Sequence, residues 1–298
     1  MTQRIVVAGA SGLIGTPLVA ALREAGHDVT ALVRREPRAA GEYHWDPDHE
    51  ILDRAALDGA DAVINLAGAS IARIPWTTGY KRTLVSSRVR PTRLLAETMA
   101  AMPQPPAVFL SGSATGYYGN RPRVRLDDES PRGDGFLADV VLAWEQAAAL
   151  APAATRVVNL RTSVVVARSG GMAPVQLLTT VGLGSKFGSG TQYWPWISLD
   201  DEVRAIIHLL DSSLAGPVLL AGPTPATANE VTAAFARLLH RPRIWPVPGW
   251  AIRFGLGEAG QSLLLDDTQV VPVRLEADGF AWRHRTVDEA IAAVVAKG

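Results

Sequence analysis

The sequence contains no cysteine and few lysines. Without cysteine, disulfide bonds, thiolate nucleophiles and cysteine-ligated metals are excluded, and the composition is compatible with a reducing compartment. The only lysines are Lys81, Lys186 and Lys297, so only these three side chains could serve as a catalytic lysine. The six histidines show no metal-ligand spacing and the sequence has no His-Glu-x-x-His motif. We therefore predict that the protein has no metal site.

Net charge and long hydrophobic runs are also missing. The 29 basic and 29 acidic side chains cancel, which favours neither a nucleic-acid partner nor a membrane surface. No apolar run approaches the roughly 20 residues that cross a bilayer. The first predicted strand lies so close to Met1 that removal of a signal peptide would destroy the motif described next. These features predict a cytoplasmic protein with a small-molecule substrate, no nucleic-acid partner and no membrane association.

A glycine-rich turn follows the first predicted strand. The apolar run Ile5–Ala8 leads directly into residues 9–15, and a helix pattern follows. Two glycines allow a tight turn and close approach of a pyrophosphate, and the third lets the helix pack on the strand. A glycine-rich turn without a ligand is the alternative. The residues predicted to cradle the pyrophosphate are Gly9, Ser11, Gly12, Leu13, Ile14 and Gly15.

Strand-like and helix-like segments alternate over the first half of the chain. This alternation is typical of an α/β protein with a doubly wound parallel Rossmann sheet. The predicted strands are Ile5–Ala8, Val29–Val33, Ala62–Asn65, Val108–Ser111 and Arg156–Leu160.

The composition of the sequence changes at about residue 166. Glycine-rich loops begin there, and most tryptophans lie after it. We predict an NADP-binding Rossmann domain over residues 1–165 and a smaller C-terminal α/β cap that binds substrate over residues 166–298. A helix over 201–210 and a last sheet strand over 218–220 indicate that the two interleave near residues 200–222.

Two arginines follow the second predicted strand, at the position that selects the cofactor. Sheets that prefer NAD usually carry an acidic residue there, about 20 residues after the glycines, which binds the ribose 2′-hydroxyl. Arg34 and Arg35 stand there instead, and guanidinium groups bind a 2′-phosphate bidentately. The pattern predicts NADP(H) in preference to NAD(H). A solvated basic turn, with Glu36 weakening the preference, is the alternative.

Further cofactor contacts are expected beyond the carboxyl ends of other strands, where ligands of parallel sheets collect. Ala67 and Gly68 are small enough for the backbone to lie against the adenine ribose. Asp46 ends a short strand where adenine or ribose passes, although an ordinary turn fits equally. Arg161 binds an anion or pairs with a buried acid. The additional predicted contacts are Asp46, Leu66, Ala67, Gly68, Ser111 and Arg161.

Several motifs resemble those of the extended short-chain dehydrogenase/reductase superfamily, in the same order and spacing over the whole chain. More narrowly, the chain is similar to the NAD(P)-dependent epimerase-family subgroup, which resembles nucleotide-sugar epimerases. The resemblance implies a nicotinamide cofactor, a substrate-holding cap and a homodimer. It rests on the turn at 9–15, Asn65–Gly68, Ser111–Gly119, Trp144-Glu145, Trp196–Asp201, Leu263–Leu265 and Gly279-Phe280.

The resemblance also implies a catalytic serine, tyrosine and lysine, of which only the serine is matched, by Ser113. Alignment on Glu145 puts the tyrosine and lysine positions at Leu137 and Val141. No lysine in the chain has a tyrosine four residues before it, so the usual dyad is missing. The remaining candidate catalytic residues are Ser113, Tyr117 and Tyr118, and each tyrosine is open to a structural role instead.

Two interpretations of function follow. The first is an NADP(H)-binding oxidoreductase or epimerase-like protein, with an atypical proton donor, acting on an unidentified carbonyl or alcohol that includes sugar-like compounds. The second is a catalytically silent NADP(H)-binding sensor or regulatory protein. Two further expectations concern packing. We expect Asp127–Glu129 to form a charged surface loop, with a general acid or a contact to substrate hydroxyls as the alternative. We expect Trp194 and Trp196 to fill core space, with stacking on a sugar or base as the alternative.

Overall fold

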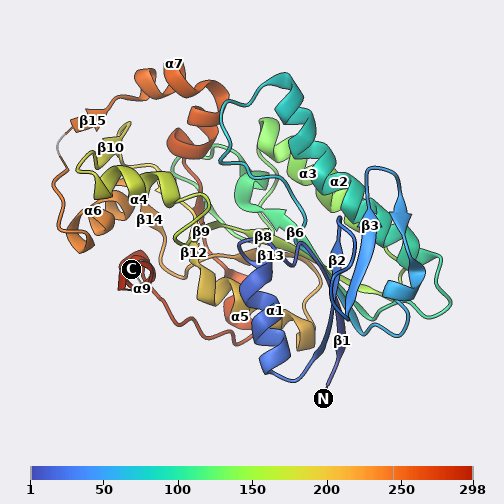
Figure 1. The fold of residues 1–298 in the computed structure, drawn as a ribbon. Helices are drawn as coiled ribbons and strands as arrows, with labels where there is room; N and C mark the ends of the chain where they lie inside the picture. The colour runs from blue at the N-terminus through green and yellow to red at the C-terminus, as the bar shows by residue number, and fades with distance from the viewer. Residues whose placement is uncertain (1, 244, 297–298) are drawn as a thin grey trace.

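An eight-stranded sheet forms the centre of the protein, for which a computed structural model describes residues 2–243 and 245–296 (Figure 1). Met1, Ile244, Lys297 and Gly298 lie outside the described residues. The strand order is β13-β8-β6-β5-β1-β2-β3-β4, and every neighbouring pair is parallel except β3 and β4. The strands are β1 Arg4–Ala8, β2 Asp28–Val33, β3 Glu42–Asp46, β4 Ile51–Leu52, β5 Ala62–Asn65, β6 Val108–Ala114, β8 Arg156–Thr162 and β13 Gly216–Leu220.

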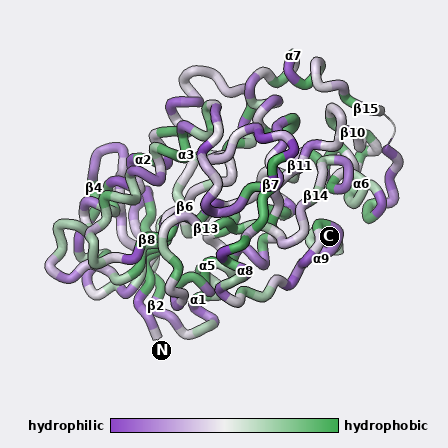
Figure 2. The backbone as a smooth tube through the Cα atoms, turned by 180° about the vertical axis from the view of Figure 1, so that it is seen from behind, coloured by the Kyte–Doolittle hydropathy of each residue, from purple (hydrophilic) through white to green (hydrophobic). Residues whose placement is uncertain are grey.

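Helices cover both faces of this sheet because its strands are apolar on both sides. Ile5 and Val7 of β1 pack with α1 (Gly15–Glu24) and α5 (Leu199–Asp211) on one face. Val6 and Ala8 pack on the other face with α2 (Thr78–Ala100) and α3 (Phe136–Ala148). Hydrophobic stretches are concentrated around β8 and α5 (Figure 2). The predicted doubly wound α/β fold is confirmed.

The predicted strands all form, and most are longer than their apolar runs. The run Val108–Ser111 extends to Ala114, and Arg156–Leu160 extends to Thr162. Strand β1 lies between β5 and β2, so the winding of the sheet reverses beside it. Such a switch point is where α/β sheets bind ligands, beyond the carboxyl ends of the strands.

The C-terminal half adds short strands and helices around a second apolar cluster. Trp194 and Trp196 are buried in this cluster, which confirms the core prediction for both. Strand β13 returns from this half to the central sheet, where it pairs with β8. The division into two domains at residues 165/166 stays a prediction. The helices are α4 Ala173–Thr180, α6 Ala228–Leu238, α7 Gly249–Gly260, α8 Val273–Ala277 and α9 Val287–Ala296. The paired strands are β9 Val164–Val166 with β12 Trp196–Ser198, β10 Ser185–Phe187 with β15 Trp245–Val247, β11 Tyr193–Trp194 with β14 Ala226–Thr227, and β7 Arg125–Leu126 with β16 Gln269–Val270.

Three short helical turns complete the description: η1 Arg54–Ala56, η2 Thr115–Tyr118 and η3 Gln261–Leu265. Over residues 2–243 and 245–296, no helix has both the length and the apolar character that crossing a bilayer requires.

Candidate functional site

The glycine-rich turn is fixed by close backbone packing at two of its glycines. Gly9 has a φ of +81°, and a Cβ there would lie 2.7 Å from the backbone carbon of Leu66. A Cβ at Gly15 would overlap the carbonyl oxygen of Gly9. Helix α1 begins at Gly15, so its first N–H groups border the turn. A helix start directly after such a turn suits a phosphate group.

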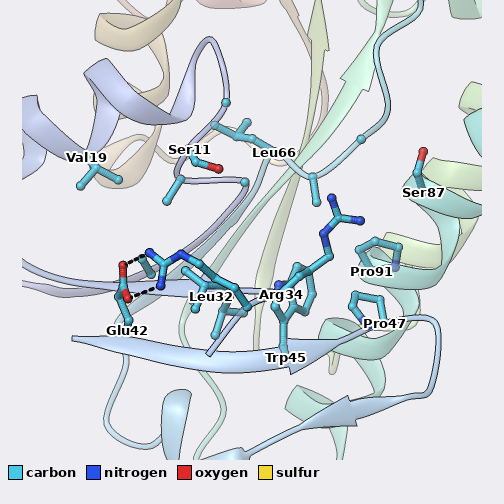
Figure 3. A pocket seen from close by; sticks show the side chains of 18 of the residues that line it. Ser11, Val19, Leu32, Arg34, Glu42, Trp45, Pro47, Leu66, Ser87 and Pro91 are labelled. Atoms are coloured by element: carbon cyan, nitrogen blue, oxygen red, sulfur yellow. Dashed lines mark hydrogen bonds and ion pairs between the residues drawn. The ribbon is translucent and has the colours of Figure 1, made fainter. Parts of the chain in front are cut away.

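A cavity of about 1390 Å³ opens beside this turn. It is bounded by the turn, the ends of β2 and β3, the loop after β5 and the side of α2 (Figure 3). Its volume exceeds that of pockets for drug-sized ligands and suits a dinucleotide. The predicted cofactor residues that line it are Gly9, Ser11, Gly12, Arg34, Arg35, Leu66, Ala67 and Gly68.

The other predicted cofactor residues do not line this cavity, for reasons visible in their contacts. Leu13 and Ile14 pack against the core of the sheet, and Gly15 is buried at the start of α1. Asp46 accepts hydrogen bonds from His49 and the backbone of Asp48, in the turn that the sequence left as an alternative. Ser111 is fully buried and its hydroxyl donates to the Gly112 carbonyl.

The two arginines after β2 differ in their contacts. Arg35 forms a bidentate ion pair with Glu42 at 2.6 and 2.8 Å. Arg34 extends above Trp45 towards Ser87 and Pro91 of α2 (Figure 3). Within the described part of the chain, no hydrogen bond or ion pair engages the Arg34 guanidinium, so its charge is available to a ligand in the cavity.

Glu42 is a cavity residue that the sequence did not reveal. Its carboxylate accepts the two Arg35 hydrogen bonds and a third, at 2.7 Å, from the backbone N–H of Arg38. The hydrogen bonds from Arg35 and Arg38 lower the pKa of Glu42 to about 2. Because Glu42 reaches Arg35 through the pairing of β3 with β2, no local motif marks it.

A second polar group lies at the carboxyl ends of β6 and β8. The hydroxyl of Ser113 donates to Glu145 Oε1 at 2.7 Å. Glu145 also accepts two hydrogen bonds from Arg161, at 2.9 and 3.0 Å. Arg161 therefore pairs with a largely buried acid, one of the two roles left open for it. Glu145, noted in the sequence only as part of a motif, joins Ser113 to Arg161.

The two tyrosines of η2 flank the Arg161 guanidinium. Tyr118 is fully buried, and its hydroxyl accepts a hydrogen bond from Arg161 Nη1 at 2.9 Å. Burial raises the pKa of Tyr118 above its usual value, which favours its neutral hydroxyl. The ring of Tyr117 stacks against the guanidinium, with 3.6 Å between Arg161 Cζ and the ring centroid. Tyr117 is only partly buried, so it is the more accessible of the pair.

Asp128 differs from the expected surface position of its loop, because its side chain is 1% exposed. The carboxylate accepts backbone hydrogen bonds from Leu219 at 2.6 Å and Arg274 at 3.1 Å. Its carbonyl accepts a further bond from Arg161 Nη1 at 3.1 Å. The surface-loop expectation is wrong for Asp128, since these long-range partners satisfy the buried carboxylate.

Apolar side chains occupy the expected dyad positions. Leu137 belongs to an apolar cluster with Trp76 and Phe136, whose rings meet edge to face at 5.7 Å. Val141 is 3% exposed. Neither side chain can transfer a proton. The described residues also contain no cluster of three or more His, Asp or Glu side chains able to hold a metal ion.

Comparison with known proteins agrees with this geometry. A family model described as the NAD dependent epimerase/dehydratase family matches residues 5–222. This chain belongs to that family. A second model, a domain of unknown function named DUF1731, matches residues 247–294 of this epimerase-family chain. The resemblance found in the sequence is therefore confirmed.

Relatives of this epimerase-family chain are similar over nearly its whole length. An epimerase family protein of Mycobacterium tuberculosis is 42% identical over 290 residues, covering 96% of each chain. Human epimerase family protein SDR39U1 is 33% identical and covers 99% of this chain and 100% of its own length.

Two solved structures share the fold of this epimerase-family chain. The crystal structure of human SDR39U1 (isoform 2) with NADPH has a TM-score of 0.90 at 30% identity and covers 98% of this chain and 99% of its own. A nucleoside-diphosphate sugar epimerase from Corynebacterium glutamicum has a TM-score of 0.82 at 32% identity and covers 99% of this chain but 58% of its own. The protein is thus a nucleotide-binding, epimerase-like protein.

Proposed function

We propose that this protein binds NADP(H) and catalyses hydride transfer between the cofactor and a carbonyl or alcohol substrate. The observation that carries the cofactor preference is Arg34, a cation that lies in the dinucleotide cavity without an acidic partner in the described residues. A 2′-phosphate supplies the anion that this guanidinium lacks. The human relative whose structure contains NADPH supports the same choice.

The remaining cofactor contacts follow from the cavity lining. Gly9, Ser11 and Gly12, with the start of α1, would hold the pyrophosphate. Ala67 and Gly68 would lie against a ribose, because their small side chains leave room for it. When bound, NADP(H) supplies or accepts the hydride.

Ser113 and Glu145 together offer a route for the proton that accompanies hydride transfer. The Ser113 hydroxyl donates a hydrogen bond to Glu145 Oε1, so the lone pairs of its oxygen remain available to accept a hydrogen bond from a substrate alcohol. As the substrate O–H bond breaks, its proton passes to Ser113 Oγ and the serine proton passes to Glu145. The reverse path delivers a proton to a carbonyl oxygen.

Arg161 and Tyr117 support this route. The four hydrogen bonds of Arg161, to Glu145, Tyr118 and the Asp128 carbonyl, fix the carboxylate that faces Ser113. The ring of Tyr117 covers the guanidinium, and its hydroxyl forms no hydrogen bond with the described residues. This hydroxyl would be available to contact the substrate.

The test is label transfer. The protein is incubated with NADPH deuterated at C4, in both stereospecific forms, and a cytosolic metabolite extract. Mass spectrometry should find a deuterated small molecule that is absent without protein. Ser113→Ala should abolish the transfer while NADPH binding persists. Saturated NADPH binding with no labelled product would contradict the enzymatic proposal.

A second function, cofactor sensing without turnover, is favoured by Leu137 and Val141. Both fill the expected dyad positions with apolar, packed side chains. A sensor should bind NADPH and NADP⁺ with different affinities, because a ligand changes a conformational equilibrium only through differential binding. Calorimetric titration with both forms, alongside the label experiment, separates the two functions. Equal affinities would eliminate the sensor.

A further inference from the structure

Arg88 of α2 is a half-buried cation that the proposed mechanism does not use. Its guanidinium donates to the carbonyl of Leu84 at 3.0 Å and to the carbonyl of Ala69 at 2.9 Å. It also lies 5.3 Å from the ring centroid of Trp144. Among the described residues no carboxylate pairs with it. Burial lowers the pKa of Arg88 to about 10, as expected for a cation that no anion compensates.

The side chain of Arg88 lies along the loop that follows β5. A Cβ at Gly68 would lie 3.3 to 3.5 Å from three of its atoms. Residues 66–70 of this loop line the dinucleotide cavity, as does Ser87, the neighbour of Arg88 on α2. Ser87 Oγ accepts the N–H of Ala69 at 3.0 Å, so adjacent residues of α2 hold both polar backbone groups of Ala69.

The position of β5 relative to the switch point indicates which half of a dinucleotide passes Arg88. With the pyrophosphate at the turn after β1, the adenine half lies on the side of β2, where Arg34 and Trp45 line the cavity. The nicotinamide half then crosses the ends of β5 and β6. The loop with Ala67 and Gly68, which the sequence placed against the adenine ribose, would on this path lie against the nicotinamide ribose instead. Arg88 lies behind this loop: its side chain packs against Gly68, and its neighbour Ser87 lines the cavity, although Arg88 itself is not among the lining residues.

Helix packing places Arg88 level with the expected lysine position. Helices α2 and α3 each follow a strand of the same parallel pair, β5 and β6, and therefore run in the same direction. Trp144 Nε1 of α3 donates to Thr92 Oγ1 of α2 at 2.8 Å. One helical turn earlier on each helix, towards the cofactor edge, are Arg88 and Val141. A positive charge is thus present at that level, but from the neighbouring helix.

We infer that Arg88 is a cofactor-binding residue whose free N–H groups donate to the ribose hydroxyls of the nicotinamide half of NADP(H). The inference rests on the proposed NADP(H) binding. It explains how the site retains a cation while residue 141 is valine. Arginine stays protonated at neutral pH, so Arg88 holds the ribose and leaves proton transfer to Ser113 and Glu145.

Two ligands distinguish the contributions that the two halves of the cofactor make to binding. Adenosine 2′,5′-bisphosphate contains the 2′-phosphate and adenine half, and NADPH contains both halves. Calorimetry should show that Arg88→Gln weakens NADPH binding on the order of tenfold, the effect of a lost hydrogen bond from a charged donor. Binding of adenosine 2′,5′-bisphosphate should be unchanged. Arg88→Lys, which keeps the charge, should recover part of the NADPH affinity.

Two arginines serve as controls. Arg34→Ala should weaken the binding of both ligands, because Arg34 faces the adenine half that both contain. Arg93→Gln, on the exposed side of α2 where Arg93 pairs with Glu97 at 3.3 Å, should weaken neither. Unchanged NADPH affinity in Arg88→Gln would overturn the inference. Equal weakening of both ligands would also overturn it and show that Arg88 only supports the Ala69 loop. If wild-type protein binds neither ligand, the proposed function itself fails.

Discussion

Glu42 determines how much of the arginine pair a 2′-phosphate can use. Its carboxylate occupies two N–H groups of Arg35, and a phosphate must compete with it for them. Arg34 has no such competitor in the described residues. At the residue scale, the proposed preference for NADP(H) therefore depends on the free arginine and is reduced by the pairing of the other; the sequence alone treated the two arginines as equivalent.

The first prediction concerns this competition. Glu42→Gln should raise NADPH affinity by roughly three- to tenfold, because a neutral amide releases Arg35 to a bidentate contact with phosphate. NADH affinity should not change, since NADH has no 2′-phosphate. Fluorescence titration of the wild type and the variant with NADPH and with NADH measures the change in each affinity. An equal gain for NADH would show that Glu42 acts on the cavity in general and not on the phosphate.

A second prediction concerns Glu202, a fully buried carboxyl at the start of α5. Its Oε1 accepts a hydrogen bond from Thr162 at 2.9 Å, whereas Oε2 has no partner among the described residues. Burial raises the pKa of Glu202 to about 8. Between its unfolded pKa, about 4.3, and pH 8, the folded protein binds more protons than the unfolded chain. Stability should therefore fall as pH rises through this window.

Glu202→Gln isolates that effect, because the amide resembles the protonated acid and does not ionise. The variant should match wild type near pH 5 and exceed its melting temperature by roughly 5 °C at pH 8. Thermal unfolding followed by circular dichroism at both pH values provides the measurement. Parallel pH curves for the two proteins would refute a buried, protonated Glu202.

At the scale of elements, α2 and α3 are joined through one hydroxyl. Thr92 Oγ1 accepts hydrogen bonds from Asn65 Nδ2 and Trp144 Nε1, both at 2.8 Å, and donates to the Arg88 carbonyl. This single atom therefore connects β5, α2 and α3. All of these groups are in or beside the apolar core, where unpaired donors are costly.

The third prediction follows from this junction. Thr92→Val keeps the shape of the side chain but leaves two buried donors without an acceptor, and should lower the free energy of unfolding by about 2 to 4 kcal/mol. Thr92→Ser retains the hydroxyl and should cost less. Urea denaturation of the two variants measures the difference. A loss in Thr92→Ser as large as that in Thr92→Val would contradict this role of the hydroxyl, because the serine variant keeps it.

Elements with strong local patterns could be predicted, and those defined by partners could not. The run Ala62–Asn65 predicted β5 with the correct bounds, because three consecutive apolar residues are followed by an asparagine at the end of the strand. Strands of two residues, such as Arg125–Leu126 and Gln269–Val270, form only because they pair with each other across the chain. The polar site shows the same limit: Ser113 and Arg161 were identified, but their connection through Glu145 required the packing of α3 on the sheet.

At the scale of the whole molecule, cofactor binding should be visible as stabilisation. The cavity is bounded by β2, β3, the β5 loop and α2, so a ligand there contacts only the folded state. NADPH at about 100 times its Kd should add roughly 2.7 kcal/mol and raise the melting temperature by about 5 °C. Differential scanning fluorimetry provides the measurement, with Arg34→Ala as control. No shift at saturating NADPH would contradict binding to the folded state.

The contacts of Asp128 bear on the order in which the site forms during synthesis. Its carboxylate receives N–H groups from Leu219 and Arg274, and its carbonyl receives Arg161. On the ribosome, Ser113, Glu145 and Arg161 emerge well before residues 219 and 274. Proteins fold from the N-terminus as they are made, so the nascent Rossmann strands precede the last supports of Arg161. We expect the glycine-rich turn at residues 9–15 to fold early. The proposed proton-transfer group of Ser113 and Glu145 should reach its final geometry only when the last quarter of the chain has left the ribosome.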